Sequence, residues 1–168
     1  MARTSVPSVF VAVSAFTLLA ACSGEAGDTV EEIAVPSGDA PAEIVQRQDN
    51  FEAIGDSFKT IREQLESEAP DFAVITPAAA DINERLQRLP GLFPEGSSME
   101  AGHDTEALAV IWEDPDGFAE VQEQAVAASA DMMAAAATGD AEAVGGQVGN
   151  LGLNGCKACH DKYRVEQE

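Results

Sequence analysis

Near its C-terminus the chain reads Gly155-Cys156-Lys157-Ala158-Cys159-His160-Asp161-Lys162-Tyr163-Arg164, and this stretch constrains the fold more than any other. It contains C-x-x-C-H, the attachment sequence of c-type haem. The spacing i, i+3 and i+4 places Cys156, Cys159 and His160 on one face of a helix, where both thiols can bond one porphyrin and the imidazole can reach its iron. We therefore predict one covalently attached haem c with His160 as the metal ligand.

Other uses of these cysteines are open but fit less well. A thioredoxin-like redox pair needs an alternating strand–helix pattern, which the sequence lacks. A zinc site would need Cys156, Cys159, His160 and the second histidine, His103, without the usual paired spacing of zinc ligands. A disulfide between the two cysteines would suit an oxidising compartment. The complete pentapeptide favours haem over all three.

The N-terminus predicts export. One basic residue, Arg3, precedes an apolar run over residues 9–21 that is too short for a convincing membrane span. The run ends Leu19-Ala20-Ala21-Cys22, which resembles a lipoprotein cleavage site, so Cys22 would carry lipid as the first mature residue. The alternative is ordinary cleavage nearby and a soluble periplasmic protein. We predict a signal peptide over residues 1–21 and a periplasmic protein attached to the membrane only through Cys22.

The rest of the chain divides into a linker and one domain. Residues 22–39 are rich in Gly, Glu, Asp, Ser and Pro, which predicts a flexible acidic linker. Residues 40–168 are enough for one domain with a proper core. Their apolar residues follow helical spacing throughout, without a convincing strand pattern. We predict an all-α fold.

Four amphipathic stripes define the expected helices. The first carries Ile44, Phe51, Ile54, Phe58, Ile61 and Leu65; the second is capped at Thr76-Pro77; the third opens at Asp114-Pro115; and the fourth runs from Asp140 through Val144, Val148 and Leu151 into Cys159. Short connections between such helices predict an antiparallel four-helix bundle that encloses the haem.

Two features break the helical pattern. Arg47, beside Gln48, falls at an inward position of the first helix, where a buried cation needs an anion such as a haem propionate; alternatively it reaches water at the open end of the bundle. Gly145, Gly146, Gly149 and Gly152 lie inside the fourth helix and disfavour it by about 1 kcal/mol each relative to alanine. Close approach of a neighbour or of the porphyrin would explain them, and so would local flexibility.

Several motifs, taken in order, resemble the cytochrome c′ family of class II cytochromes c. They are Arg47-Gln48 followed by Phe51, the loop Phe93-Pro94-Glu95-Gly96-Ser97, Trp112 before the third helix, and the C-x-x-C-H segment ending Tyr163-Arg164. The resemblance implies that Arg47, Gln48, Phe51 and Arg164 border the haem, with Phe51 on the distal face and Arg164 on the proximal face. It also implies a homodimer formed through the first two helices, which carry Lys59, Arg62, Arg85 and Arg88.

The distal position indicates the function. Low-spin relatives place a methionine where this chain has Phe51, and the first helix here contains none. A five-coordinate iron held by His160 is therefore expected, with Met132 and Met133 in core packing and His103 in an exposed loop. The resemblance then implies binding of nitric oxide or carbon monoxide, with electron transfer to an unknown partner as the alternative and no enzymatic activity. The net charge of −21 argues against nucleic acid.

Overall fold

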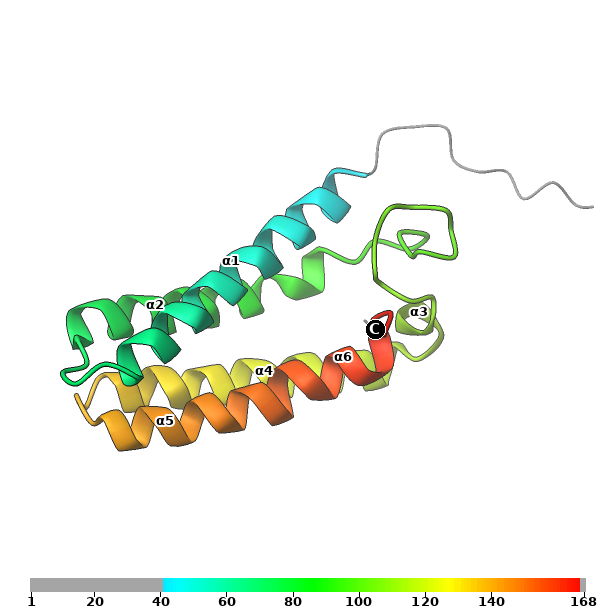
Figure 1. Cartoon of the computed structure of the whole chain (residues 1–168). Helices are drawn as coiled ribbons and strands as arrows, with labels where there is room; N and C mark the ends of the chain where they lie inside the picture. The colour runs from blue at the N-terminus through cyan, green and yellow to red at the C-terminus, as the bar shows by residue number, and fades with distance from the viewer. Residues whose placement is uncertain (1–40, 167–168) are drawn as a thin grey trace, which may run out of the picture. The chain divides into compact units, whose positions relative to one another are not determined.

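The computed structural model describes residues 41–166, and every regular element within them is helical. In chain order the elements are α1 (Ala42–Leu65), α2 (Phe72–Gln87), the 3-10 turn η1 (Leu89–Gly91), α3 (Val110–Glu113), α4 (Pro115–Ala136), α5 (Ala141–Asn150), the π-helical segment η2 (Leu151–Lys157) and α6 (Ala158–Tyr163). Helix α1 packs beside α2 and α5, and α4 packs beside α2 and the continuous run α5–η2–α6 (Figure 1). The predicted all-α four-helix bundle is confirmed for these residues.

The predicted signal peptide, the linker and Cys22 lie outside the described residues. The domain boundaries at residues 21 and 39 therefore stay predictions. None of the helices within residues 41–166 combines the length and the apolar character that a membrane span requires.

The core joins all four long helical segments. Fully buried side chains come from each of them: Ile44 and Ile61 from α1, Ile75 and Ile82 from α2, Met132 from α4 and Val144 from α5. Burying each such side chain contributes roughly 1.5–3 kcal/mol. A smaller cluster of Ala107, Ile111, Phe118 and Tyr163 lies where α3 and the start of α4 meet α6, and Phe93 packs against both clusters. Phe93 therefore links the bundle core to the loop before α3.

The second helix begins earlier than predicted. It starts at Phe72, where Asp71 caps it by accepting a hydrogen bond from the amide of Ala73 at 2.8 Å, and Pro77 lies inside it. The amide that proline lacks would have bonded the carbonyl of Ala73, an exposed residue near the helix end, where water can take its place. The predicted start at Thr76-Pro77 was wrong because Asp71 provides an earlier cap.

The fourth predicted helix is interrupted by η2. Cys156 lies on this π-helical segment, whereas Cys159 and His160 lie on α6, so the three residues do not share one regular α-helical face. The close approach expected of the helix glycines occurs at Gly155, where an added Cβ would lie 2.7 Å from Leu151 Cδ1 and 3.3 Å from Ala125 Cα.

The glycines that the sequence singled out are less crowded. An added Cβ would meet nothing within 4 Å at Gly145, Gly146 or Gly149, and only Phe58, at 3.9 Å, from Gly152. Close approach therefore does not explain the first three.

Candidate functional site

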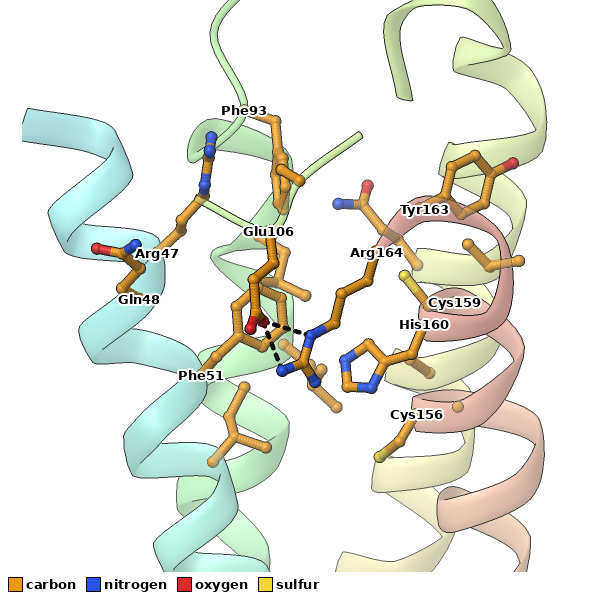
Figure 2. Close-up of a pocket in the computed structure, with 18 of the residues that line it drawn as sticks. Arg47, Gln48, Phe51, Phe93, Glu106, Cys156, Cys159, His160, Tyr163 and Arg164 are labelled. Carbon is orange, nitrogen blue, oxygen red and sulfur yellow. Dashed lines mark hydrogen bonds and ion pairs between the residues drawn. The ribbon is translucent and has the colours of Figure 1, made fainter. Parts of the chain in front are cut away.

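A cavity of about 670 Å³ opens between α1, α2, α4 and the η2–α6 segment. Its volume lies within the range of roughly 300–1,000 Å³ that is usual for ligand pockets. The cavity wall includes every residue that the sequence predicted for the haem site, namely Arg47, Gln48, Phe51, Cys156, Cys159, His160 and Arg164 (Figure 2). Its floor is largely apolar, with Ile54, Ile82 and Leu86 among the lining residues. The structure thus gathers residues from both ends of the domain around one apolar space.

Both thiols of the C-x-x-C-H sequence are free and line this cavity. Burial raises the pKa of Cys156, and burial together with Cys156 raises the pKa of Cys159 to about 11. His160 reaches solvent at the cavity mouth, but partial burial lowers its pKa and the nearby Arg164 guanidinium lowers it further. A neutral imidazole is favoured, and this is the form that binds a metal ion.

Phe51 faces His160 across the cavity. The centroids of the two rings are 6.4 Å apart with an interplanar angle of 69°, and Phe51 also makes an edge contact with Phe93 at 6.5 Å (Figure 2). One wall therefore presents a phenyl ring to the space above the histidine. A phenyl ring offers neither an iron ligand nor a hydrogen-bond donor.

Arg47 points inward and has 2% of its surface exposed, so the alternative in which it reaches water is wrong. Its guanidinium donates to Ser97 Oγ at 2.7 Å, to Ser97 O at 2.5 Å and to Thr105 Oγ1 at 2.7 Å, and it lies 5.1 Å from the centre of the Phe93 ring. Burial lowers the pKa of Arg47. All of these partners are neutral, so within residues 41–166 no carboxylate accepts a hydrogen bond from this buried positive charge at the cavity wall.

Gln48 and Arg164 tie the cavity mouth to the loop before α3. Gln48 Nε2 donates to the carbonyl of Asp104 at 3.0 Å. Arg164 Nε donates to Glu106 Oε2 at 2.6 Å, and its backbone forms a bridge with Ala107 (Figure 2). The sequence did not identify Glu106, because nothing in its surroundings distinguishes it from other exposed acids.

Asp114 anchors α6 to the start of α4. It accepts hydrogen bonds from the Tyr163 hydroxyl at 2.8 Å, from Lys162 Nζ at 2.5 Å and from the amide of Gly117 at 3.3 Å. The bonds from Lys162 and Tyr163 lower the pKa of Asp114. Gly117 has no room for a side chain, because an added Cβ would overlap Asp114 Oδ2. The sequence identified Asp114 as a helix cap but gave no sign of its link to α6.

Gln122 is a further residue that sequence reasoning missed. It lines the cavity with 9% of its surface exposed, and within residues 41–166 its Nε2 is the buried side-chain polar atom that has no hydrogen-bond partner. It lies four residues after Phe118 and three before Ala125, both buried on α4. A polar residue within that apolar stripe was the signal that could have revealed it.

The comparisons with known proteins agree with this site. The family model described as Cytochrome C' matches residues 42–164. The chain belongs to the cytochrome c′ family. A curated relative, cytochrome c′ of Rhodopseudomonas palustris, is 35% identical over 127 residues, which cover 74% of this chain and 82% of the relative.

Solved structures of cytochromes c′ share the fold. The protein from Rhodobacter sphaeroides has a TM-score of 0.69 at 29% identity and covers 77% of this chain and 100% of its own. A nitric oxide complex of a mutant from Alcaligenes xylosoxidans has a TM-score of 0.66 at 25% identity, with 74% and 94% covered. Another neighbour, described as having ligand-controlled dimer dissociation, has a TM-score of 0.69 at 28% identity, with 74% and 95% covered.

Proteins of this family carry a covalently bound c-type haem, and the cavity fits that group. Cys156 and Cys159 line the cavity as free thiols that would attach the group, and His160 beside them would offer its imidazole to the iron. The unpartnered amide of Gln122 and the charge of Arg47 provide two buried groups that can bind polar atoms of a cofactor. His103, the fourth ligand of the zinc alternative, is half-buried rather than exposed and is not part of the described cavity wall.

Proposed function

We propose that this chain binds a small diatomic gas, nitric oxide or carbon monoxide, at a vacant position of the haem iron on the Phe51 side. The observation that carries the proposal is the pairing of Phe51 with His160, with their ring centres 6.4 Å apart on opposite cavity walls. Bound haem supplies an iron with one coordination position open to a neutral gas. His160 would hold the iron through its imidazole, and the Phe51 ring, which cannot ligate iron, would cover the space in which the gas binds.

The same wall favours some gases over others. Bound oxygen is stabilised by a hydrogen-bond donor over the iron, and a phenyl ring at this position provides none. Nitric oxide and carbon monoxide depend less on such a donor. The relative from Alcaligenes xylosoxidans, solved as a nitric oxide complex, supports the proposal through its shared fold.

An optical spectrum of the ferrous protein, recorded with and without nitric oxide, tests the proposal. We expect a five-coordinate, high-spin spectrum that changes on adding the gas. His160→Ala should abolish the native spectrum. A six-coordinate, low-spin spectrum without gas would overturn the vacant position, above all if Met132→Leu or Met133→Leu converted it to high-spin. Met132 is fully buried in the core, whereas Met133 is exposed and not in core packing as expected. Neither methionine is among the described cavity residues, which supports a high-spin spectrum without gas.

Electron transfer is the second candidate function. The net charge of −21 supports it, because a strongly acidic surface would steer a basic redox partner toward the protein, which a neutral surface would not do. A low-spin spectrum with fast self-exchange would support it. We propose no catalytic role, because His160 is the single histidine among the described cavity residues, so they lack the second histidine that, paired with an arginine over the iron, would cleave a peroxide bond.

We also propose a homodimer formed through α1 and α2. Three of the four basic residues noted there pair with a carboxylate one turn away on the same helix: Lys59 with Glu63, Arg85 with Asp81 and Arg88 with Glu84. Each of these pairs has no net charge, so the basic residues do not make α1 and α2 positive. They still offset acidic charge on these helices and so lower the repulsion between two acidic copies. Sedimentation velocity with and without carbon monoxide tests the dimer and any dissociation by ligand, as described for one neighbour.

A further inference from the structure

The side-chain amide nitrogen of Gln122 is buried but has no hydrogen-bond partner within residues 41–166. A buried N–H without a partner costs roughly 1–3 kcal/mol, so native proteins keep very few of them. Gln122 is 9% exposed, and its Nε2 has no hydrogen-bond partner although the residue borders the cavity. This pattern is expected when the partner arrives with the molecule that fills the cavity.

Contacts between α4 and the η2–α6 segment show which part of the cavity Gln122 borders. The Phe118 ring lies 5.0 Å from the Tyr163 ring, and Gly155 packs against Ala125. Gln122 lies between Phe118 and Ala125 on α4, just as Cys159 lies between Tyr163 and Gly155 on the opposite segment. Gln122 is therefore level with the end of the cavity that Cys159 borders.

Phe93 connects this end to Arg47. The Phe93 ring packs on Phe118 at 4.9 Å, and the Arg47 guanidinium lies 5.1 Å from the centre of the same ring. Phe93, Arg47 and Gln122 all border the cavity. The amide donor of Gln122, one helical turn beyond Phe118, and the buried cation of Arg47 thus border one cavity, an arrangement that suits an anionic group.

Haem brings few atoms that can accept a strong hydrogen bond. Its pyrrole nitrogens are bound to iron, its macrocycle is apolar, and thioether sulfur is a weak acceptor. Its two carboxylates are the strong acceptors. We propose that Gln122 is a cofactor-binding residue whose Nε2–H donates to a haem propionate beside Phe93. This inference concerns the cofactor and does not depend on gas binding.

The test compares holoprotein variants in the absence of gas. Gln122→Leu removes the donor at similar size, and Gln122→Glu keeps the shape but replaces the donor with an acid. Gln124→Leu is the control, because Gln124 is exposed on the same helix and bonds Glu120. The measurements are the propionate vibrations in resonance Raman spectra, the reduction midpoint potential and the denaturant midpoint.

We expect both Gln122 variants to shift the propionate band and the Gln124 control to leave it unchanged. Losing a donor to the carboxylate leaves more negative charge near the iron, so the reduction potential should fall in the order wild type, Gln122→Leu, Gln122→Glu. The unfolding equilibrium should move toward the unfolded state by on the order of tenfold in Gln122→Leu.

Two results would overturn the proposal. If Gln122→Leu loses stability while the propionate band and the potential stay unchanged, the amide binds a buried water instead. If Gln122→Leu is as stable as wild type or more stable, the amide stays unpaired in the holoprotein. Should the leucine variant fail to accumulate, an unchanged potential and propionate band in Gln122→Glu would exclude the bond equally well.

Discussion

At the scale of single residues, we expect Phe51 to control what can reach the iron. Its ring faces His160 and makes an edge contact with Phe93, so under the proposed function it would fill space that a gas needs. Phe51→Ala should remove this steric exclusion and raise carbon monoxide affinity by about tenfold, equivalent to about 1.4 kcal/mol. Flash photolysis and equilibrium titration measure the change.

Phe72→Ala is the matched control, because Phe72 packs against the core but is not among the described cavity residues. An affinity that rises equally in both variants would point to general loosening of the bundle. Phe51→Met should produce a low-spin iron, as in the low-spin relatives.

Arg47 is expected to act on the iron through its charge. If it pairs with a haem propionate, Arg47→Met should lower the reduction potential, and losing the bonds to Ser97 and Thr105 should lower the free energy of unfolding by about 2–3 kcal/mol. Arg47→Lys should recover the potential better than the stability, because it keeps the charge but not the fork of donors. Potentiometric titration and denaturant unfolding separate the two effects. An unchanged potential in Arg47→Met would exclude the pairing.

At the scale of elements, the sequence predicted four helices because their buried stripes repeat along the chain. It could not predict η2, since a π-helical segment depends on how Gly155 and Leu151 pack against α4 and not on local propensity. It also misplaced the start of α2, where Asp71 and Thr76-Pro77 both present start signals. Local patterns thus identified the helices, a second local cap signal moved the start of α2, and tertiary packing accompanies the irregular segment η2.

Gly155 and Gly149 should respond in opposite ways to the same substitution. Gly155→Ala places a Cβ 2.7 Å from Leu151 Cδ1 and 3.3 Å from the backbone Cα of Ala125 on α4, so we expect it to lower the free energy of unfolding by about 1–3 kcal/mol. Gly149→Ala meets open space within α5 and should raise it by up to about 1 kcal/mol. Denaturant unfolding of the holoproteins measures both. If both substitutions changed the free energy of unfolding by the same amount, the close contact of Gly155 with Ala125 on α4 would not limit the side chain at this position.

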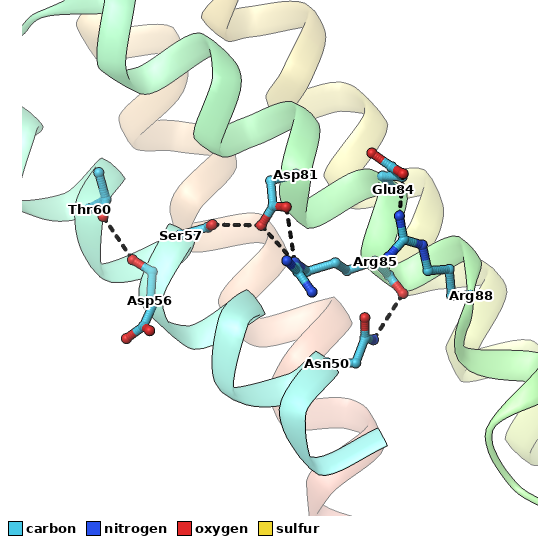
Figure 3. Close-up of polar contacts among 8 residues, drawn as sticks. All are labelled: Asn50, Asp56, Ser57, Thr60, Asp81, Glu84, Arg85 and Arg88. Atoms are coloured by element: carbon cyan, nitrogen blue, oxygen red, sulfur yellow. Dashed lines mark hydrogen bonds and ion pairs between the residues drawn. The ribbon is translucent and has the colours of Figure 1, made fainter. Parts of the chain in front are cut away.

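The pairing of α1 with α2 should depend on pH through Asp81. Asp81 accepts hydrogen bonds from Ser57 on α1 at 2.8 Å and from Arg85 Nε, and Asn50 donates to the carbonyl of Arg85 at 3.1 Å (Figure 3). Partial burial raises the pKa of Asp81, but the bonds from Arg85 and Ser57 outweigh it and the pKa is lowered overall. The pair is partly exposed, so its contribution is at most about 1 kcal/mol.

A carboxylate with a lowered pKa contributes stability above its ordinary pKa of 3.8, and that contribution disappears as the pH falls through the folded-state pKa. Asp81→Asn should therefore lower the melting temperature at pH 7 and have little effect near pH 2. The control is Asp56→Asn, an exposed position on α1. A deficit of equal size at both pH values would mean that the carboxylate charge is not the cause.

At the scale of the whole molecule, the sequence predicted the haem-bearing end best. Cys156, Cys159 and His160 lie within one pentapeptide and carry their own chemistry, Arg47 broke a regular apolar stripe, and Phe51 was identified through the family resemblance. The oxygens of Ser97 and Thr105, which hold Arg47, and the Glu106 partner of Arg164 come from an irregular loop. No spacing rule connects that loop to α1 or α6. The roles of Ser97, Thr105 and Glu106 therefore appear only in the folded chain.

We expect lipid on the N-terminal segment to hold the domain at a membrane. Leu19-Ala20-Ala21-Cys22 predicts lipid on Cys22, and the acidic residues 23–39, which lie outside the described residues, would then link the lipid to the haem domain. Several acyl chains on one cysteine hold a small domain firmly, because each buried CH₂ contributes about 0.8 kcal/mol. Wild-type protein should therefore fractionate with membranes, whereas Cys22→Ser should be released or remain as unprocessed precursor. Mass spectrometry of the purified protein gives the decisive measurement. A soluble wild-type chain without lipid mass would exclude the anchor and leave the haem site unaffected.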